Sequence, residues 1–305
     1  MKFELSIIIP TKDRGIIFKQ TLESVLSATI QINAEIIIIN DSKVPIKEIS
    51  SSFKVKIYQN IGEGVASARN FGFSKASSDL LFFLDDDILI TKDVVNKLLQ
   101  YAKNDLNNLY ISNWKYPEKL DKELKKTSFG RFLLNNKLNS LKGWINLNSW
   151  SDVDLMEIKS GASFCLLIHK NKFISINGYN EKFPYAGAED YDFCERLKNI
   201  GTRFFIDPKM MVFHNESDRI SLNNWLNRKK RDSATKKLAL NLGYTKFKIK
   251  YSFQKVILCE SVYFFRSFII LLVNVIPNKI FFDKFHNNLI LTLCAAYIYK
   301  GYNEY

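Results

Sequence analysis

Short, continuous apolar runs alternate with longer stretches of helical period through the first hundred residues. The strand-like runs are Leu5–Ile9, Ile36–Ile39, Val55–Tyr58 and Leu80–Leu84. The helix-like stretches are Ile17–Ala28, Val65–Ala76 and Asp93–Ala102. Strands that are covered on both faces have unbroken apolar runs of this kind. The pattern therefore predicts a Rossmann-like α/β fold, with a mostly parallel central sheet and helices on both faces.

Polar residues gather where each of these predicted strands ends. The four clusters are Thr11-Lys12-Asp13-Arg14, Asn40-Asp41-Ser42, the segment from Asn60 to Asn70, and Asp85-Asp86-Asp87. Ligands of open parallel sheets bind at the carboxyl ends of the strands. The clusters therefore predict a binding site at one edge of the sheet.

The triple aspartate is the most informative of these clusters. Asp85, Asp86 and Asp87 directly follow a buried strand, and adjacent carboxylates raise one another's pKa unless a cation neutralises them. Mg²⁺ and Mn²⁺ prefer oxygen ligands of this type. A metal-bound diphosphate is the functional interpretation, and a solvated acidic turn is the alternative for an isolated Asp-x-Asp.

The second half of the chain carries a weaker pattern. Asparagine and lysine are frequent between residues 104 and 148, which predicts a loop-rich insertion. The expected elements are a short helix near Phe129–Leu138, a strand at Phe164–Ile168, a helix at Glu189–Lys198, and strands at Arg203–Ile206 and Met210–Phe213. His214 stands at the end of the last strand.

One glycine motif has two interpretations. The segment from Gly62 to Ala68 follows a strand and opens a helix, and Asp85 lies about twenty residues further on, as in a dinucleotide-binding fingerprint. However, it follows the third predicted strand, and that interpretation leaves the triple aspartate, the Glu189-Asp190 pair and His214 unexplained. The glycines fit better as a loop that brings a helix start close to a nucleotide, with Arg69 directed at anionic oxygens.

Six motifs in chain order carry a family resemblance. They are the segments Ile9–Arg14, Ile39–Ser42, Asn60–Gly72 and Phe83–Asp87 in the first half, and Ile176–Phe183 and Gly187–Asp192 in the second. Gly161-Ala162-Ser163 also opens a strand, as in the same family. Together they resemble the inverting family 2 glycosyltransferases of GT-A fold, from about Lys2 to Asn215.

The resemblance implies a nucleotide-sugar donor site. Its residues are Pro10, Thr11, Asp13, Arg14, Asp41, Gly62, Arg69, Asp85 and Asp86. Asp41 would read the base, usually uracil, while Arg69 and Asp85 would hold the nucleoside and the diphosphate. Lys12 stands where many relatives carry an aromatic residue that stacks on the base.

The resemblance also implies a metal and a catalytic base. Asp87, together with Asp85 and His214, would bind Mn²⁺ or Mg²⁺. Asp190 would take the proton of the attacking hydroxyl, with Glu189 orienting it or the donor sugar. The alternative for Glu189 and Asp190 is a favourable interaction with a helix N-terminus.

The resemblance implies contacts with the acceptor as well. Asp192 and Tyr185 are the residues expected to touch it. A single base opposite the leaving group implies inversion at the anomeric carbon, so an α-linked donor would give a β-linked product.

The chain changes character after Ser221. Of 44 Lys and Arg residues against 31 Asp and Glu in the whole chain, ten basic residues and one acid fall between Arg228 and Lys255. A basic block of this kind usually indicates nucleic acid or an anionic membrane, with a solvated helix face as the alternative. A basic helix is expected at Ser221–Leu242.

An apolar stretch follows at Val256–Ile276. It is long enough to span a bilayer, but Glu260 and Arg266 make that arrangement unfavourable. A helix in the headgroup region, or one buried against the catalytic domain or a partner subunit, fits better. Pro277 ends this helix, and a second helix of the same type is expected at Ile280–Tyr299.

Compartment and domain division follow from the same features. The four cysteines, Cys165, Cys194, Cys259 and Cys294, show no pairing or metal-ligand spacing, and no secretory signal is expected at the N-terminus. A cytoplasmic protein, peripheral on the inner membrane face, is therefore expected. Residues 1–220 would form the catalytic domain, with a nucleotide-binding half at about 1–103 and an acceptor half at about 150–220. Residues 221–305 would form a helical extension.

The resulting hypothesis is a metal-dependent inverting glycosyltransferase. It would move a sugar from a nucleotide-diphosphate sugar, with UDP-sugar favoured, to a hydroxyl of a glycan or a lipid-linked saccharide. Residues 228–299 would contact an anionic membrane, and homo-oligomerisation through the C-terminal extension at residues 221–305 is the other expected role. No nucleic acid is expected. The alternatives are a polyprenyl-phosphate sugar synthase, a non-catalytic nucleotide-sugar-binding protein and a nucleic-acid-binding protein.

Overall fold

The computed structural model describes residues 2–46, 54–142, 150–151 and 155–304. Its contacts divide the chain into two compact units. The first comprises Met1–Tyr116, Ser140–Pro184 and Glu189–Glu216. The second comprises Pro117–Asn139, Tyr185–Ala188 and Ser217–Tyr305.

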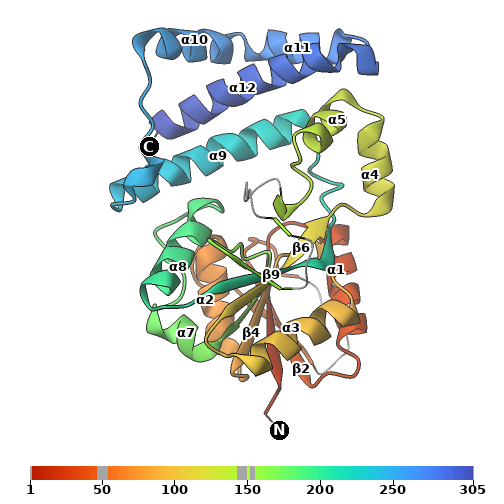
Figure 1. The fold of residues 1–305 in the computed structure, drawn as a ribbon, viewed down its shortest axis with the longest axis vertical. Helices are drawn as coiled ribbons and strands as arrows, with labels where there is room; N and C mark the ends of the chain where they lie inside the picture. The colour runs from red at the N-terminus through yellow and green to blue at the C-terminus, as the bar shows by residue number, and fades with distance from the viewer. Residues whose placement is uncertain (1, 47–53, 143–149, 152–154, 305) are drawn as a thin grey trace. The chain divides into compact units, whose positions relative to one another are not determined.

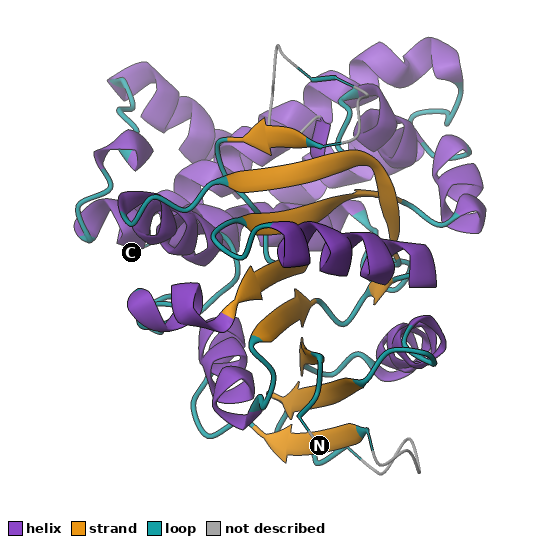
Figure 2. Cartoon of the chain, turned by 60° about the horizontal axis from the view of Figure 1, so that its bottom comes forward, coloured by secondary structure: helices purple, strands orange, loops and turns teal. Residues whose placement is uncertain are grey.

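The first unit is built on one sheet (Figures 1 and 2). Its strands are β1 (Leu5–Thr11), β2 (Ala34–Asn40), β3 (Val55–Gln59), β4 (Leu80–Leu84), β5 (Ile88–Leu89), β6 (Leu109–Lys115), β7 (Met156–Ile158), β8 (Cys165–His169) and β9 (Phe204–His214). The order is β3-β2-β1-β4-β8-β6-β9-β5, and β7 pairs with β9. The strands β3, β2, β1 and β4 run parallel, whereas β8 is antiparallel to both β4 and β6.

Helices cover this sheet. They are α1 (Gly15–Ala28), α2 (Gly64–Lys75), α3 (Lys92–Asn104), α7 (Lys170–Ser175) and α8 (Ala188–Asn199). The crossover through α1 runs outward from β1 to β2, whereas the crossover through α2 runs back from β3 to β4, so right-handed connections place these helices on opposite faces. Strands β1, β2 and β4 are consequently buried along their whole length, as their unbroken apolar runs predict. The predicted α/β class is confirmed.

One predicted pair of strands is a single strand. The runs Arg203–Ile206 and Met210–Phe213 both belong to β9, and its register with β6 shifts between Ser112 and Asn113. At the irregularity, Asp207 Oδ1 accepts hydrogen bonds from the backbone amides of Lys209 (2.9 Å) and Met210 (3.2 Å). Asp207 and Pro208 are typical turn residues, so the sequence resembles a turn at this point. The strand nevertheless continues through the irregularity.

The second unit is helical. Its elements are α4 (Glu118–Lys125), α5 (Ser128–Asn135), α9 (Leu222–Asn241), η1 (Thr245–Phe247), α10 (Phe253–Phe264), α11 (Arg266–Val275), η2 (Ile280–Phe282) and α12 (Asp283–Asn303). Helix α12 packs against α9, α10, α11 and α5. Ser221 caps α9, because its Oγ accepts the N–H of Asn224 at 3.2 Å.

The apolar stretch Val256–Ile276 is broken in two. Helices α10 and α11 meet at Phe265 with a bend of 66°. Among the described residues, no single helix has the length and hydropathy to cross a membrane, and this bent pair reaches both only when its two helices are taken together.

Buried Glu35 on β2 gives a pH-dependent prediction. Burial alone raises the pKa of Glu35, but hydrogen bonds from Ser77 (2.6 Å from its amide), Ser6 (2.7 Å) and Lys56 (3.3 Å) outweigh burial and lower the pKa below its ordinary value. A lowered folded pKa stabilises the protein above the unfolded pKa, and this stabilisation is lost as pH falls through the folded pKa. Glu35→Gln should therefore lower the free energy of unfolding by about 1.5–3 kcal/mol at neutral pH and by progressively less in acid.

Urea denaturation of the wild type and of Glu35→Gln, from neutral pH into acid, measures the difference in the free energy of unfolding. The exposed Glu23→Gln is the matched control and should change stability by less than about 0.5 kcal/mol. An equal penalty for Glu35→Gln at every pH would show that the charge of Glu35 does not stabilise the fold.

Candidate active site

The carboxyl ends of β1, β2 and β4 bring the predicted clusters together in the first unit. Thr11 ends β1, Asp41 follows β2, and the triple aspartate follows β4. The end of β9 adds His214, and the start of α8 adds Glu189 and Asp190. Segments that are far apart in sequence thus meet at one edge of the sheet.

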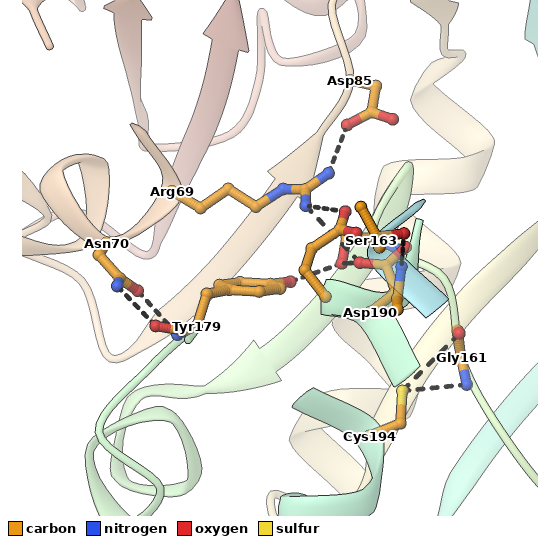
Figure 3. Close-up of polar contacts among 11 residues, drawn as sticks. Arg69, Asn70, Asp85, Gly161, Ser163, Tyr179, Asp190 and Cys194 are labelled. Carbon is orange, nitrogen blue, oxygen red and sulfur yellow. Dashed lines mark hydrogen bonds and ion pairs between the residues drawn. The ribbon is translucent and has the colours of Figure 1, made fainter. Parts of the chain in front are cut away.

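Arg69 on α2 is the cationic centre of one half of the site (Figure 3). Its side chain is 3% exposed, and Nη2 donates to Asp85 Oδ1 at 2.9 Å. Its Nη1 lies 3.4 Å from Glu189 Oε1 and 3.6 Å from Asp190 Oδ1. The guanidinium also packs over the ring of Tyr179, 5.1 Å from its centre. One buried cation therefore serves three carboxylates, and negative charge is in excess.

Asp190 is held by a short hydrogen-bond chain (Figure 3). The Ser163 amide donates to Asp190 Oδ2 at 3.2 Å, and the Ser163 hydroxyl donates to Asp190 Oδ1. The Tyr179 hydroxyl lies 2.6 Å from the Ser163 hydroxyl. Burial raises the pKa of Tyr179, and the charge of Asp190 raises it further, so the phenol stays protonated. The chain fixes the Asp190 carboxylate in one orientation.

The two acids of this helix start differ in exposure. The side chain of Asp190 is 26% exposed, whereas that of Glu189 is 2% exposed. A carboxylate that is both oriented and reachable can accept a proton from a hydroxyl group. Asp190 meets both conditions, and Glu189 meets only the first.

Asp87 lies at the centre of the other half of the site. Its Oδ2 accepts from Arg14 Nη2 at 2.7 Å, and its Oδ1 lies 3.2 Å from His214 Nε2. The other ring nitrogen of His214 is 3.4 Å from Glu216 Oε1. Burial lowers the pKa of His214, but Asp87 and Glu216 outweigh it and raise the pKa to about 9.

Asp86 is turned away from its neighbours and toward the turn that follows β1. Its Oδ2 accepts from Thr11 Oγ1 at 2.7 Å, and its Oδ1 lies 3.5 Å from Arg14 Nε. Its backbone carbonyl accepts from Thr21 Oγ1 at 2.9 Å. Asp86 thus ties the triple aspartate to β1 and α1, whereas Asp85 faces Arg69 and Asp87 faces His214.

Asp85, Asp87 and His214 are the residues predicted to bind a divalent cation. Within the described ranges, no group of three or more His, Cys, Asp and Glu side chains has the arrangement of a metal site. The donor chemistry nevertheless fits Mn²⁺ or Mg²⁺, because Asp85 and Asp87 supply carboxylates and His214 an imidazole. Desolvation raises the pKa of Asp85 despite Arg69, and Asp87 and Asp190 raise it further. This excess of negative charge is what a divalent cation would relieve.

Asp41 joins the end of β2 to the start of α2. Its Oδ1 accepts from Asn60 Nδ2 at 2.7 Å and from the Gly64 amide at 3.2 Å, and Lys12 Nζ lies 3.1 Å from Oδ2. A Cβ on Gly62 would lie 2.1 Å from Ser67 Oγ. Close packing therefore explains the first glycine of this loop, and a positive φ of 86° explains Gly64.

The other predicted donor residues lie around the end of β1. Pro10 is buried in the strand. Asp13 is exposed, has a φ of 53°, and donates its amide to Ser42 Oγ at 2.8 Å. Its backbone thus links the turns that follow β1 and β2.

The predicted acceptor residues are placed differently. The Asp192 side chain is 4% exposed and lies 2.6 Å from Arg196, which in turn donates to the carbonyl of Gly178 at 2.7 Å. It therefore braces the turn before α8 and is not presented at the surface of the site. Tyr185 belongs to the second unit and is 44% exposed.

Sequence reasoning missed the roles of several residues of this site, and Glu216 beside His214 is one of them. Ser163 and Tyr179 lie in motifs that carry the family resemblance, but their hydrogen-bond chain to Asp190 was not foreseen. The turn that carries Tyr179 is fixed by Asn70, whose side chain bonds both the carbonyl (2.9 Å) and the amide (2.8 Å) of Tyr179. The sequence signal for this turn was Asn70, a polar residue that directly follows Arg69 in the same motif.

Comparison with known proteins identifies the family and supports the fold. Residues 6–152 match the model of glycosyl transferase family 2, and residues 156–216 match that of the N-terminal domain of galactosyltransferase. An uncharacterized glycosyltransferase of Haemophilus influenzae is 28% identical over 205 residues, which cover 63% of this chain and 61% of that protein.

Two solved structures are similar in fold. A mannosyltransferase of Pyrobaculum calidifontis in complex with GDP-Man and Mn²⁺ matches with a TM-score of 0.57 at 10% identity, over 100% of this chain and 89% of that one. GalNAc-T7 with UDP, GalNAc and Mn²⁺ matches with a TM-score of 0.52 at 16% identity, over 70% of this chain and 43% of that one.

The class of protein follows from these findings. The first unit is a GT-A fold domain with a polar site at the carboxyl ends of its strands. Residues 6–152 belong to glycosyl transferase family 2. The predicted family resemblance and the predicted fold are confirmed.

Proposed function

We propose that the protein is an inverting glycosyltransferase that moves a sugar from a nucleotide-diphosphate sugar to a hydroxyl group of a glycan or a lipid-linked saccharide. The observation that carries this proposal is the paired arrangement of acidic groups in the first unit. Asp85 and Asp87 lie beside Arg69 and His214, where a diphosphate with its cation would bind. Asp190, fixed by Ser163 and partly exposed, is suited to take a proton.

A UDP-sugar is the donor that we favour. The name of one structural neighbour includes UDP and that of another GDP-Man, so the fold accommodates more than one base. Asp41, which follows β2 and accepts from the Gly64 amide at the start of α2, is the residue that we assign to the base. Lys12, which bonds Asp41, takes the place of a stacking aromatic and would contact the donor through its charge.

The residues that would hold a divalent cation are Asp85, Asp87 and His214. A bound cation would neutralise the negative charge that develops on the leaving diphosphate. Both structural neighbours carry Mn²⁺ in their names, which supports this assignment. Arg69 would contribute a second, permanent positive charge on the same group.

The Asp190 carboxylate would remove the proton of the acceptor hydroxyl as that oxygen attacks the anomeric carbon. Ser163 keeps the carboxylate in position, and Glu189 with Arg69 keeps the helix start in place. A polyprenyl-phosphate acceptor would arrive already ionised and would need no base. The hydrogen-bond chain from Tyr179 to Asp190 favours the hydroxyl acceptor for this reason.

Removal of an assigned metal-binding residue should weaken metal-dependent donor binding. Asp87→Ala and His214→Ala are each expected to weaken binding of UDP in the presence of Mn²⁺ by at least about tenfold, because each removes one assigned ligand. Isothermal titration calorimetry measures the affinity, and exposed Asp93→Ala on α3 is the control. Unchanged affinity in both variants would place the metal site elsewhere.

The hydrogen bonds that link Tyr179 through Ser163 to Asp190 should affect turnover and leave donor binding unchanged. Ser163→Ala removes the hydroxyl that bonds Asp190 and is expected to lower kcat about tenfold, with Kd for the donor unchanged. Tyr179→Phe keeps that bond and should have a smaller effect on kcat. If Ser163→Ala weakens donor binding and leaves kcat intact, Ser163 does not position the base.

The proposal as a whole is tested by a donor panel. Ligands that bind the folded state raise the melting temperature. Thermal shift with UDP-, GDP-, ADP- and CMP-sugars, with Mn²⁺ and with EDTA, should show Mn²⁺-dependent stabilisation by at least one nucleotide-diphosphate sugar. No stabilisation by any member of the panel would contradict the proposed donor site.

A further inference from the structure

The helices α10 and α11 expose an unusual amount of apolar surface. Nine apolar residues of α10, α11 and η2 are each more than half exposed, from 51% for Ile257 to 87% for Phe281. We name six of them the apolar face: Ile257, Phe264, Phe268, Leu271, Val275 and Phe281. Large apolar side chains that gather on the surface of a water-soluble protein usually mark a binding site.

The apolar face is separate from the side of α10 and α11 that packs within the second unit. Cys259 and Val262 on α10 and Val273 on α11 are buried, and α10 and α11 pack along α12 (Figure 1). Ile257 and Phe264 are seven residues apart on α10, and Phe268, Leu271 and Val275 recur every three or four residues on α11. By helical period, both sets lie on a different side of the helices from the buried residues. These helices therefore have one apolar side against α12 and a second one outward.

Two charged residues of these helices, Glu260 and Arg266, make contacts within the second unit. Glu260 pairs with Lys300 of α12 at 2.9 Å. Arg266 Nη1 donates to the carbonyl of Tyr263 at 2.8 Å, and the guanidinium lies over the Tyr263 ring. A surface helix in water carries its polar residues outward. Here large apolar side chains lie outward as well, which favours contact with a non-aqueous surrounding.

The surroundings of the apolar face are positively charged. Exposed lysines flank it in sequence at Lys246, Lys248, Lys250, Lys255, Lys279 and Lys284. Between residues 245 and 285 the acids are Glu260 and Asp283, and Asp283 pairs with Arg131 at 2.7 Å. Lysines next to an apolar surface attract anionic lipid headgroups.

A hollow at the junction of α11 and α12 also combines apolar walls with a lysine. Its volume is about 490 Å³, and Pro277, Phe282 and Phe285 contribute to its walls. Lys284 also lines it. An apolar hollow with one ammonium group fits a lipid chain that lies below a phosphate.

We propose that the apolar face inserts into the headgroup region of an anionic lipid bilayer, with α10 and α11 lying along the membrane surface. Glu260 and Arg266 within the apolar stretch favour a surface position over a span. The charge complementarity between the flanking lysines and anionic lipid selects this occupant over a second copy of the chain, which would carry the same positive charge. The proposal is independent of the sugar-transfer reaction.

Flotation with liposomes tests the proposal on the full chain. The protein should float with vesicles of phosphatidylglycerol and phosphatidylethanolamine at low salt, and much less with pure phosphatidylcholine. Phe264→Ser with Phe281→Ser should reduce the bound fraction at least about tenfold. Ile30→Ser with Val44→Ser is the matched control, because these residues are 73% and 72% exposed in the first unit, and it should bind like the wild type.

Salt and charge changes separate the two contributions. About 0.5 M NaCl should weaken binding without abolishing it, because salt screens the lysines and leaves apolar burial intact. Lys255→Glu, Lys279→Glu and Lys284→Glu together should weaken binding to anionic vesicles at low salt by at least about tenfold.

Three results would overturn the proposal. One is a protein that stays unbound with anionic vesicles at low salt. Another is a Phe264→Ser, Phe281→Ser variant that floats like the wild type. The third is an oligomer, measured by light scattering, that dissociates in this variant while vesicle binding is absent, since the apolar face would then be a contact between copies of the chain.

Discussion

Asp190→Asn is expected to lower turnover by about 100-fold or more, with donor affinity little changed. Asparagine keeps the shape of aspartate and one acceptor oxygen, but its amide cannot take a proton. The loss should therefore appear in kcat and not in Kd for the donor. Because the Asp190 side chain is 26% exposed and bonded to Ser163, the substitution should leave the fold intact.

Two comparisons sharpen this result. Glu195→Gln on the same helix, with Glu195 paired to Lys198, is the control and should turn over like the wild type. Turnover of Asp190→Asn that equals the wild type would remove Asp190 from the mechanism. It would also favour an acceptor that is already ionised, such as a phosphate.

Arg69→Met is expected to destabilise the protein by about 3–5 kcal/mol and to abolish donor binding. Arg69 is the buried cation beside Asp85, Glu189 and Asp190, and its loss leaves these carboxylates without their common partner. Arg69→Lys should recover only part of the stability, because one ammonium group cannot replace a guanidinium that bonds in two directions.

Urea denaturation of the metal-free protein measures this effect. Arg203→Met is the matched control, because its ion pair with Glu157 is exposed on both sides and should contribute less than about 1 kcal/mol. Stability of Arg69→Met equal to that of the wild type would show that these carboxylates do not depend on Arg69.

The parallel part of the fold could be predicted from sequence because its strands are buried on both faces. Unbroken apolar runs such as Leu80–Leu84 leave no ambiguity about a covered strand, and the polar clusters after them converge as the topology of parallel sheets requires. Strand β6 was missed, because Ser112 and Asn113 interrupt its apolar pattern inside an asparagine-rich region.

The direction of each side chain in the site could not be predicted. Nothing in three consecutive aspartates shows that Asp86 turns toward Thr11 while Asp85 faces Arg69. The chain from Tyr179 through Ser163 to Asp190 joins residues from three separate motifs, so it exists only in the folded protein. The break between α10 and α11 at Phe265 was also unforeseen, because no proline or glycine marks it.

The most direct test of the proposed reaction is the release of nucleoside diphosphate from nucleotide sugars. The wild-type protein with Mn²⁺ and a saccharide acceptor should release it from at least one donor, with EDTA abolishing release and Asp190→Asn lowering it by about 100-fold. Release that continues at the same rate in EDTA or in Asp190→Asn, or no release from any donor, would contradict metal-dependent sugar transfer at this site.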